Sequence, residues 1–203
     1  MFLAIDFDGT LCEGFVNRYL FKHLNLYEKL RPFENEWDSG KISDLTLLSK
    51  MASLLSGVSS KQISEGLKSV QFKPGAQELI DFCRPLFPIV VVSQAFVEFL
   101  EPPCKSLGID NIIGSTLRFR DGKVCGPERI LANGRAKLEA LREFLTDKRW
   151  EDEFIMIGDS AGDSALFSEA SLSISVGEQR AQHNLFSLNE AIPVIKTFLE
   201  GQH

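Results

Sequence analysis

The sequence has little of three features that would assign the protein to other classes. Only four of its 203 residues are cysteines, and none forms a CxxC pair or a zinc-finger spacing. No apolar run approaches the ~20 residues of a membrane-spanning helix. Acidic residues outnumber basic ones by 28 to 22, for a net charge of −6, and no dense Lys/Arg cluster is present. We therefore expect no structural zinc, no membrane partner and no nucleic-acid partner.

The scattered cysteines also bear on the compartment. Cys12, Cys83, Cys104 and Cys125 are typical of reduced thiols in the cytosol. The first apolar run, FLAI, is too short for the hydrophobic region of a signal peptide, so we expect a cytoplasmic protein. Hydrophobic residues make up 44% of the chain and charged residues 25%, a balance typical of a soluble globular protein.

Short apolar runs that alternate with helical patterns predict an α/β fold. The expected strands are residues 2–5, 88–92, 112–113, 154–157 and 172–176. The expected crossover helices are residues 77–84, 135–144, 164–169 and 191–199. Because these runs do not alternate apolar and polar residues, the strands should be covered on both faces and pair in parallel. The pattern predicts a doubly wound sheet.

The gap between the first two strands is longer than a single crossover needs. Its apolar spacing predicts three helices, at residues 16–30, 44–55 and 60–70, which would form a helical insert over the sheet edge. Lys73-Pro74-Gly75 marks the return to the core. Further on, Pro102 and Pro103 predict a helix break near Glu101, and Asp121-Gly122 predicts a tight hairpin turn.

Two strand ends carry paired carboxylates. Asp6 and Asp8 follow the first strand, and Asp159 and Asp163 follow the fourth. Two like charges at about 5 Å repel by about 3 kcal/mol at an effective dielectric of 20, which a bound divalent cation would offset. An all-oxygen ligand set favours Mg²⁺. The simpler alternative, that these acids cap helices or decorate loops, is disfavoured by the recurrence of DxDGT and GDxxxD after separate strands.

These residues form part of a longer ordered pattern. DFDGT after the first strand, VVVSQ at the end of the second, GRAKLEAL and GDSAGD resemble the four motifs of the haloacid dehalogenase (HAD) superfamily. The spacing is most similar to its phosphoserine-phosphatase-like branch, which has a small helical cap of the C1 type. The resemblance implies a three-layer, Rossmann-like, HAD-like core of residues 1–12 and 73–203, with a helical cap of residues 13–72.

The resemblance also implies an activity. The protein would be a Mg²⁺-dependent phosphomonoester hydrolase that forms an aspartyl-phosphate on Asp6, with Asp8 as general acid and then general base. The metal ligands would be Asp6, the Asp8 main-chain carbonyl and Asp159, with Asp163 orienting waters. Phosphoryl oxygens would be bound by Thr10, Ser93, main-chain N–H groups around Gly9 and Gln94, and Lys137. Without the order of the motifs, Lys137 would be interpreted as a solvated surface lysine. Arg135, two residues away, is the alternative candidate for the cation of this motif.

Some positions differ from the branch's usual pattern. Gln94 and Ala95 stand where two glycines are usual, and Gly162 stands where Asn is frequent. These differences leave the hydrolytic residues intact but argue against phosphoserine itself. The substrate should be a small phosphorylated metabolite, and its specificity should come from the insert. The candidates are Glu13, Arg18 and Arg31, for each of which a solvated surface position is the alternative.

Three alternatives stay open. A phosphotransferase or mutase would use the same residues with a different phosphoryl acceptor. A non-catalytic phospho-receiver module also gathers aspartates and a lysine around Mg²⁺, but it needs no helical insert. A catalytically idle relative is disfavoured because no motif residue has been lost. We expect a monomer or a homodimer.

Overall fold

Seven strands form a single sheet in the order β4-β3-β2-β1-β5-β6-β7 in the computed structural model, which describes residues 1–201. Their bounds are β1 Phe2–Ile5, β2 Ile89–Phe96, β3 Asn111–Arg120, β4 Lys123–Arg129, β5 Phe154–Gly158, β6 Leu172–Ser175 and β7 His183–Asn184. All neighbouring pairs are parallel except β3 and β4. The predicted doubly wound α/β sheet is confirmed.

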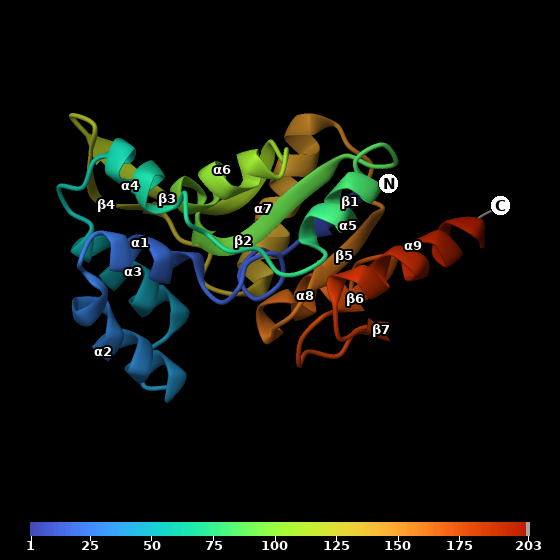
Figure 1. The fold of residues 1–203 in the computed structure, drawn as a ribbon, viewed down its shortest axis with the longest axis horizontal. Helices are drawn as coiled ribbons and strands as arrows, with labels where there is room; N and C mark the ends of the chain where they lie inside the picture. Colours follow the sequence, from blue (N-terminus) through green and yellow to red (C-terminus); the bar gives the residue numbers. More distant parts are fainter. Residues whose placement is uncertain (202–203) are drawn as a thin grey trace.

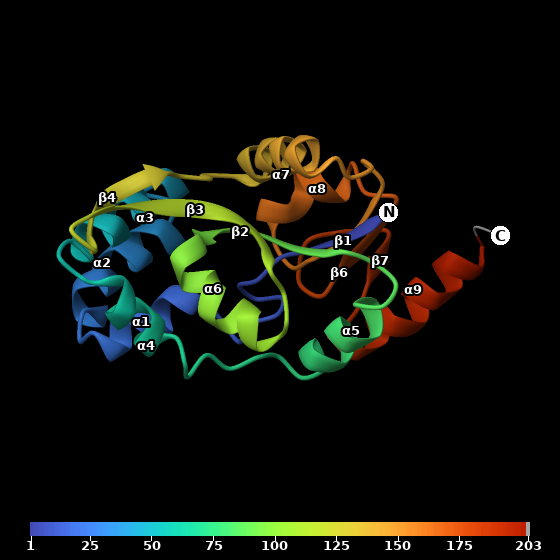
Figure 2. The ribbon, with the colours of Figure 1, turned by 90° about the horizontal axis from the view of Figure 1, so that it is seen from above.

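Helices cover both faces of the sheet, as Figure 2 shows. On one face lie α5 (Ala76–Cys83), α6 (Val97–Ser106) and α9 (Ala191–Glu200), and on the other lie α7 (Gly134–Lys148) and α8 (Ser164–Phe167). Successive strand residues point to opposite faces, so Leu3 and Ile5 of β1 belong to one apolar cluster and Phe2 and Ala4 to the other. Two short 3₁₀ helices, η1 (Ala161–Asp163) and η2 (Leu188–Glu190), complete this part.

Four further helices lie between β1 and α5 and gather at one end of the molecule (Figure 1). They are α1 (Val16–His23), α2 (Tyr27–Asp38), α3 (Asp44–Leu54) and α4 (Ser60–Gly66). The prediction of one helix over residues 16–30 was wrong, because Asn25 adopts a left-handed conformation with φ 55° and separates α1 from α2. The division into a core of residues 1–12 and 73–203 and a cap of residues 13–72 stays a prediction.

The predicted hairpin is present and holds the four-helix insert against the rest of the chain. Asp121 and Gly122, with φ of 52° and 72°, form the tight turn between β3 and β4. Val124 of β4 accepts a hydrogen bond from the Gly57 N–H and donates one to the Val58 carbonyl, each 2.9 Å long. These two backbone bonds join the insert to an extension of the sheet, far in sequence from β1.

One helix boundary differs from expectation. Helix α6 continues through Pro102 and Pro103, so the break predicted near Glu101 was wrong. The prolines remove two backbone donors, but Phe99, Leu100, Pro103 and Cys104 are buried, and this packing keeps the segment helical. Within residues 1–201, none of the helices has the length and apolar character needed to cross a membrane.

Candidate active site

The acidic pairs meet because their strands are neighbours. Strands β1 and β5 pair in parallel with Ile5 opposite Ile157, and the Asp6 N–H donates to the Ile157 carbonyl at 2.9 Å. Asp6 and Asp159 each follow directly after one of these strands. One carboxylate oxygen from each of Asp6, Asp159 and Asp163 lies within 4.8 Å of the others. The two chain segments thus converge on one point, at the carboxyl ends of the strands.

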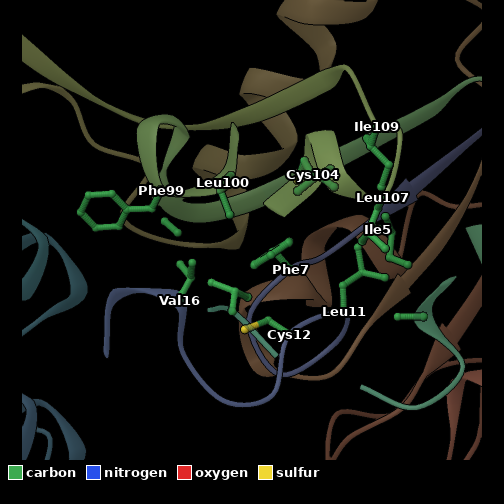
Figure 3. Packing of buried hydrophobic residues seen from close by; sticks show 14 of the residues in the cluster. Ile5, Phe7, Leu11, Cys12, Val16, Phe99, Leu100, Cys104, Leu107 and Ile109 are labelled. Atoms are coloured by element: carbon green, nitrogen blue, oxygen red, sulfur yellow. The ribbon is translucent and has the colours of Figure 1, made fainter. Parts of the chain in front are cut away.

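The loop after β1 is fixed by its own backbone and by Phe7. The Phe7 carbonyl accepts hydrogen bonds from the N–H groups of Leu11 and Cys12, each at 2.9 Å. The Phe7 ring is fully buried, and Figure 3 shows it between this loop and helix α6, which carries Leu100. The loop is therefore anchored in the core, and this fixes the backbone of Asp6 and Asp8 on either side of Phe7.

Gly9 is required by its surroundings. Its φ of 74° is in the left-handed region, and a Cβ atom at this position would overlap the carboxylate of Asp159. The sequence suggested that the Gly9 N–H binds a phosphoryl oxygen. In the structure this N–H instead donates to the Gly14 carbonyl at 3.0 Å. Gly9 instead allows the β1 loop to approach Asp159 closely.

Lys137 bridges two of the carboxylates. Its Nζ lies 2.8 Å from Asp6 Oδ1 and 2.6 Å from Asp163 Oδ1, and the side chain is only 2% exposed. Burial alone lowers the pKa of Lys137, but the charges of Asp6 and Asp163 outweigh it and raise that pKa above its ordinary value. Arg135, the competing cation, is exposed and pairs with Glu139 at 3.0 Å. The structure thus brings Lys137, and not Arg135, to the acidic cluster.

Asp163 is held by three donors from the protein. Its Oδ2 accepts from the N–H groups of Asp159 at 3.0 Å and Ser160 at 3.2 Å, while its Oδ1 accepts from Lys137. The side chain is fully buried. Because both oxygens are engaged, Asp163 acts on its neighbours by fixing the turn that presents Asp159 and by orienting Lys137.

The two remaining catalytic candidates, Asp6 and Asp8, have different surroundings although only one residue separates them in the sequence. Burial, followed by the charge of Asp163, raises the pKa of Asp6 well above its usual value, while Lys137 opposes that shift. Asp8 is not bonded to Lys137. Its Oδ1 accepts the N–H of Val16 at 2.6 Å, and its pKa is raised to about 7, chiefly by burial. Asp6 and Asp8 are therefore held by different partners.

A cavity of about 550 Å³ opens over the cluster, within the range of about 300–1,000 Å³ of small-molecule sites. Asp6, Asp8, Lys137 and Asp159 line it. Ser93 also lines it, at an irregularity of β2 where the pairing register with β3 shifts, and its Oγ accepts the Ala95 N–H at 3.2 Å. The cavity lining therefore includes most of the groups that the sequence singled out for phosphoryl chemistry, but neither Thr10 nor Asp163.

Gln94 crosses from the core to the insert. Its Nε2 donates to Asp44 Oδ2 at 2.9 Å, and its Oε1 lies over Gly162, 3.0 Å from where a Cβ of that glycine would be. Its side chain therefore spans from the turn after β5 to the first residue of α3. The sequence placed Gln94 near the phosphate or leaving group but not in this contact.

Three candidates lie elsewhere. Thr10 is fully buried, does not line the cavity, and directs its hydroxyl to Asp159 Oδ1 at 3.5 Å, so its place is behind that carboxylate. Glu13 is exposed and lies outside the cavity lining. Arg31 is also outside it and pairs with Glu28 at 2.9 Å on the surface. Of the proposed specificity residues, only Arg18 lines the cavity.

Five polar residues line the cavity that the sequence did not identify as site residues: Asn17, Glu34, Trp37, Asp44 and Ser160. Glu34 is only 4% exposed and accepts from Arg18 Nε at 3.1 Å and Asn17 Nδ2 at 3.2 Å. A lone Glu in a polar helix gives no sequence signal of burial. Ser43-Asp44 is a helix-start signal that places Asp44 in the first turn of α3, but its contact with Gln94 of the core is a tertiary feature that the signal does not indicate.

Known proteins share this sequence pattern. Residues 3–168 match the family model described as haloacid dehalogenase-like hydrolase. The phosphoserine phosphatase of Campylobacter jejuni subsp. doylei is 29% identical over 177 residues, covering 85% of this chain and 84% of that protein. The phosphoserine phosphatase of Albidiferax ferrireducens is 28% identical over 163 residues, covering 74% of this chain and 67% of that protein.

Solved structures share the fold. A phosphoserine phosphatase described as a phospho-aspartyl intermediate analogue superposes with a TM-score of 0.77 at 23% identity, covering 97% of both chains. The phosphoserine phosphatase of T. onnurineus superposes with a TM-score of 0.69 at 27% identity, covering 96% of this chain and 94% of that one. With its strand-end aspartates, buried lysine and inserted helices, the chain belongs to the haloacid dehalogenase-like hydrolases and is a phosphatase of the phosphoserine-phosphatase-like type.

Proposed function

We propose that the protein hydrolyses the phosphomonoester of a small cytoplasmic metabolite in the presence of Mg²⁺, with Asp6 as the nucleophile. The observation that carries this proposal is the buried contact of Lys137 with Asp6 and Asp163 at the floor of a cavity that Asp159 also lines. The free cysteines, three of them buried, support the cytoplasmic location.

The residues present fit a magnesium ion. Three carboxylate oxygens lie within 4.8 Å of one another, and oxygen atoms are the ligands that Mg²⁺ prefers. Both oxygens of Asp163 are engaged by the protein, which leaves Asp6 and Asp159, together with the main-chain carbonyl of Asp8, as the proposed ligands. When bound, the ion would supply positive charge that stabilises the oxygens of the transferring phosphoryl group.

The first half of the reaction uses Asp6 and Asp8. A carboxylate oxygen of Asp6 attacks phosphorus, the bond from phosphorus to the ester oxygen breaks, and the departing oxygen takes a proton from Asp8. Lys137 fixes the orientation of Asp6 through Oδ1. The hydrogen bond from Val16 engages Asp8 Oδ1, so we assign the transferred proton to Oδ2. The product is an aspartyl-phosphate on Asp6.

The second half returns the enzyme to its starting state. Asp8, now ionised, removes a proton from a water molecule whose oxygen attacks phosphorus, and the bond between phosphorus and Asp6 breaks. Phosphate leaves, Asp6 is again a carboxylate, and Asp8 is again protonated. We propose that Ser93 and Lys137 bind the phosphoryl oxygens during both steps, which their place in the cavity lining supports.

The experiment is release of phosphate from p-nitrophenyl phosphate with Mg²⁺, with and without EDTA. Wild type should turn over and EDTA should stop it. Asp6→Asn should lose the activity because an amide is a poor nucleophile, while Asp110→Asn, at an exposed site, should keep it. If Asp6→Asn retains more than a small fraction of the wild-type rate, the assignment of the nucleophile is wrong. Adding an alcohol and assaying for its phosphate ester separates a hydrolase from a phosphotransferase.

A further inference from the structure

Apart from the acidic cluster, the cavity is lined mainly by hydrocarbon side chains, and we call this part of the cavity the apolar compartment. Phe15, Leu47, Leu48 and Met51 line it from the insert, and Phe96 and Phe99 line it from the core. Leu47, Leu48 and Met51 lie on one face of α3, at positions i, i+1 and i+4, and are each at most 7% exposed. A ligand that fills this compartment therefore meets apolar surface on both sides.

The charged side chains of this compartment are already paired. Glu34, 6% exposed at its side chain, binds the Arg18 Nε at 3.1 Å and the Asn17 amide. Asp44 accepts from the Gln94 amide and from the Trp37 indole N–H. Within residues 1–201, each charged lining residue outside the cluster of Asp6, Asp8, Lys137 and Asp159 thus has a protein partner.

These pairings decide which leaving groups are favoured. An amino-acid leaving group such as serine carries an ammonium and a carboxylate, and each needs an oppositely charged partner when it leaves water. Here Asp44, the acceptor that an ammonium would need, is already engaged by Gln94 and Trp37 and would have to give up one of these contacts. Arg18, the cation that a carboxylate would need, has its charge already balanced by the buried Glu34. A hydrocarbon leaving group meets no such cost and gains from burial against the apolar walls.

We infer that the substrate is the phosphomonoester of an uncharged, mainly hydrocarbon alcohol, and not of an amino acid. The inference rests on the proposed function, since it takes the phosphoryl group to lie on the acidic cluster and the alcohol to extend toward α3. It separates this chain from the phosphoserine phosphatases that it resembles.

Binding can be tested without turnover by using n-alkylphosphonates, whose C–P bond this chemistry does not cleave. The affinities of ethyl-, butyl- and hexylphosphonate for the wild-type protein with Mg²⁺ are measured by titration calorimetry. We expect Kd to fall by about fourfold for each methylene buried, until the chain fills the compartment. A Kd that does not fall with chain length overturns the inference.

A matched pair of variants locates the effect. Phe15 is the N-cap residue of α1 and makes no side-chain capping bond, so Phe15→Ser suits the local fold while removing an aromatic wall. Leu45→Ser removes a side chain that is 51% exposed on α3, outside the cavity lining. Phe15→Ser should weaken hexylphosphonate at least fivefold more than ethylphosphonate, and Leu45→Ser should change neither. Equal behaviour of the two variants would place the alkyl chain elsewhere and overturn the inference.

A second experiment compares the rates at which the wild-type protein hydrolyses different phosphomonoesters. For wild type, kcat/KM should be at least tenfold higher for butyl phosphate than for phosphoserine or phosphoethanolamine, and a preference for either amine overturns the inference. The outcome for the proposed function is separate. If the phosphonate affinities rise with chain length but no phosphomonoester is hydrolysed, the hydrocarbon site stands and the hydrolase assignment fails.

Discussion

Replacing Lys137 with methionine tests the charge balance of the site most directly. Methionine keeps an unbranched apolar stem in a site that is 2% exposed, but it removes the ammonium between Asp6 and Asp163. Two buried carboxylates then face each other without a cation. Removing one partner of a buried ion pair costs about 3–5 kcal/mol.

The expected effect is large enough to measure by thermal unfolding. For a domain of this size a loss of 1 kcal/mol lowers Tm by about 2–4 °C, so Lys137→Met should lower Tm by about 10 °C in EDTA. Lys148→Met is the matched control, because Lys148 is exposed on the same helix. It should change Tm by no more than about 2 °C, since surface contacts contribute little.

A second substitution separates charge from packing. Asp163→Asn can still accept the N–H groups of Asp159 and Ser160 through its amide oxygen, and it removes one of the two unpaired charges. The double variant should therefore unfold at a higher temperature than Lys137→Met alone. The reasoning is refuted if Lys137→Met is as stable as wild type, or if Asp163→Asn lowers its Tm further.

Other substitutions should divide the functions of the site. Asp8→Asn keeps an oxygen for the Val16 N–H but cannot give a proton, so it should slow alkyl phosphates at least tenfold more than p-nitrophenyl phosphate, and equal losses would argue against Asp8 as the acid. Gly9→Ala should displace Asp159 and raise the Mg²⁺ concentration for half-maximal activity at least tenfold, and an unchanged value would contradict the close approach. Asp44→Ala should raise KM several-fold by freeing Gln94, whereas an unchanged KM would show that the contact does not position substrate.

The sequence predicts the acidic cluster well because parallel strands bring their carboxyl ends to one edge. The apolar runs indicate that Asp6 and Asp159 each end a buried strand of one parallel sheet, and the structure shows that these two strands are neighbours. Lys137 is different, since its helix alone resembles a surface helix. Only the order of the motifs distinguishes it from Arg135, two residues away.

The sequence does not predict those features of the site and the fold that depend on tertiary contacts. Nothing in the sequence around Gly9 shows that its N–H donates to Gly14, or that Thr10 lies behind Asp159. The continuation of α6 through Pro102 likewise depends on burial against the sheet. Glu34 is the clearest case, because its helix is polar and only tertiary packing against α1 buries its carboxylate.

Asp6 and Asp8 have different proposed roles because they contact different parts of the protein. Asp6 contacts Lys137 on the core helix α7, whereas Asp8 contacts the first N–H of α1, the helix that opens the insert. Burial raises the pKa of Asp8, and the Val16 N–H opposes that rise by stabilising the carboxylate. The residue proposed to exchange protons is therefore held by the insert, and the proposed nucleophile by the core. A displacement of α1 relative to the sheet would disturb proton transfer first, while Asp6 keeps its contact with Lys137.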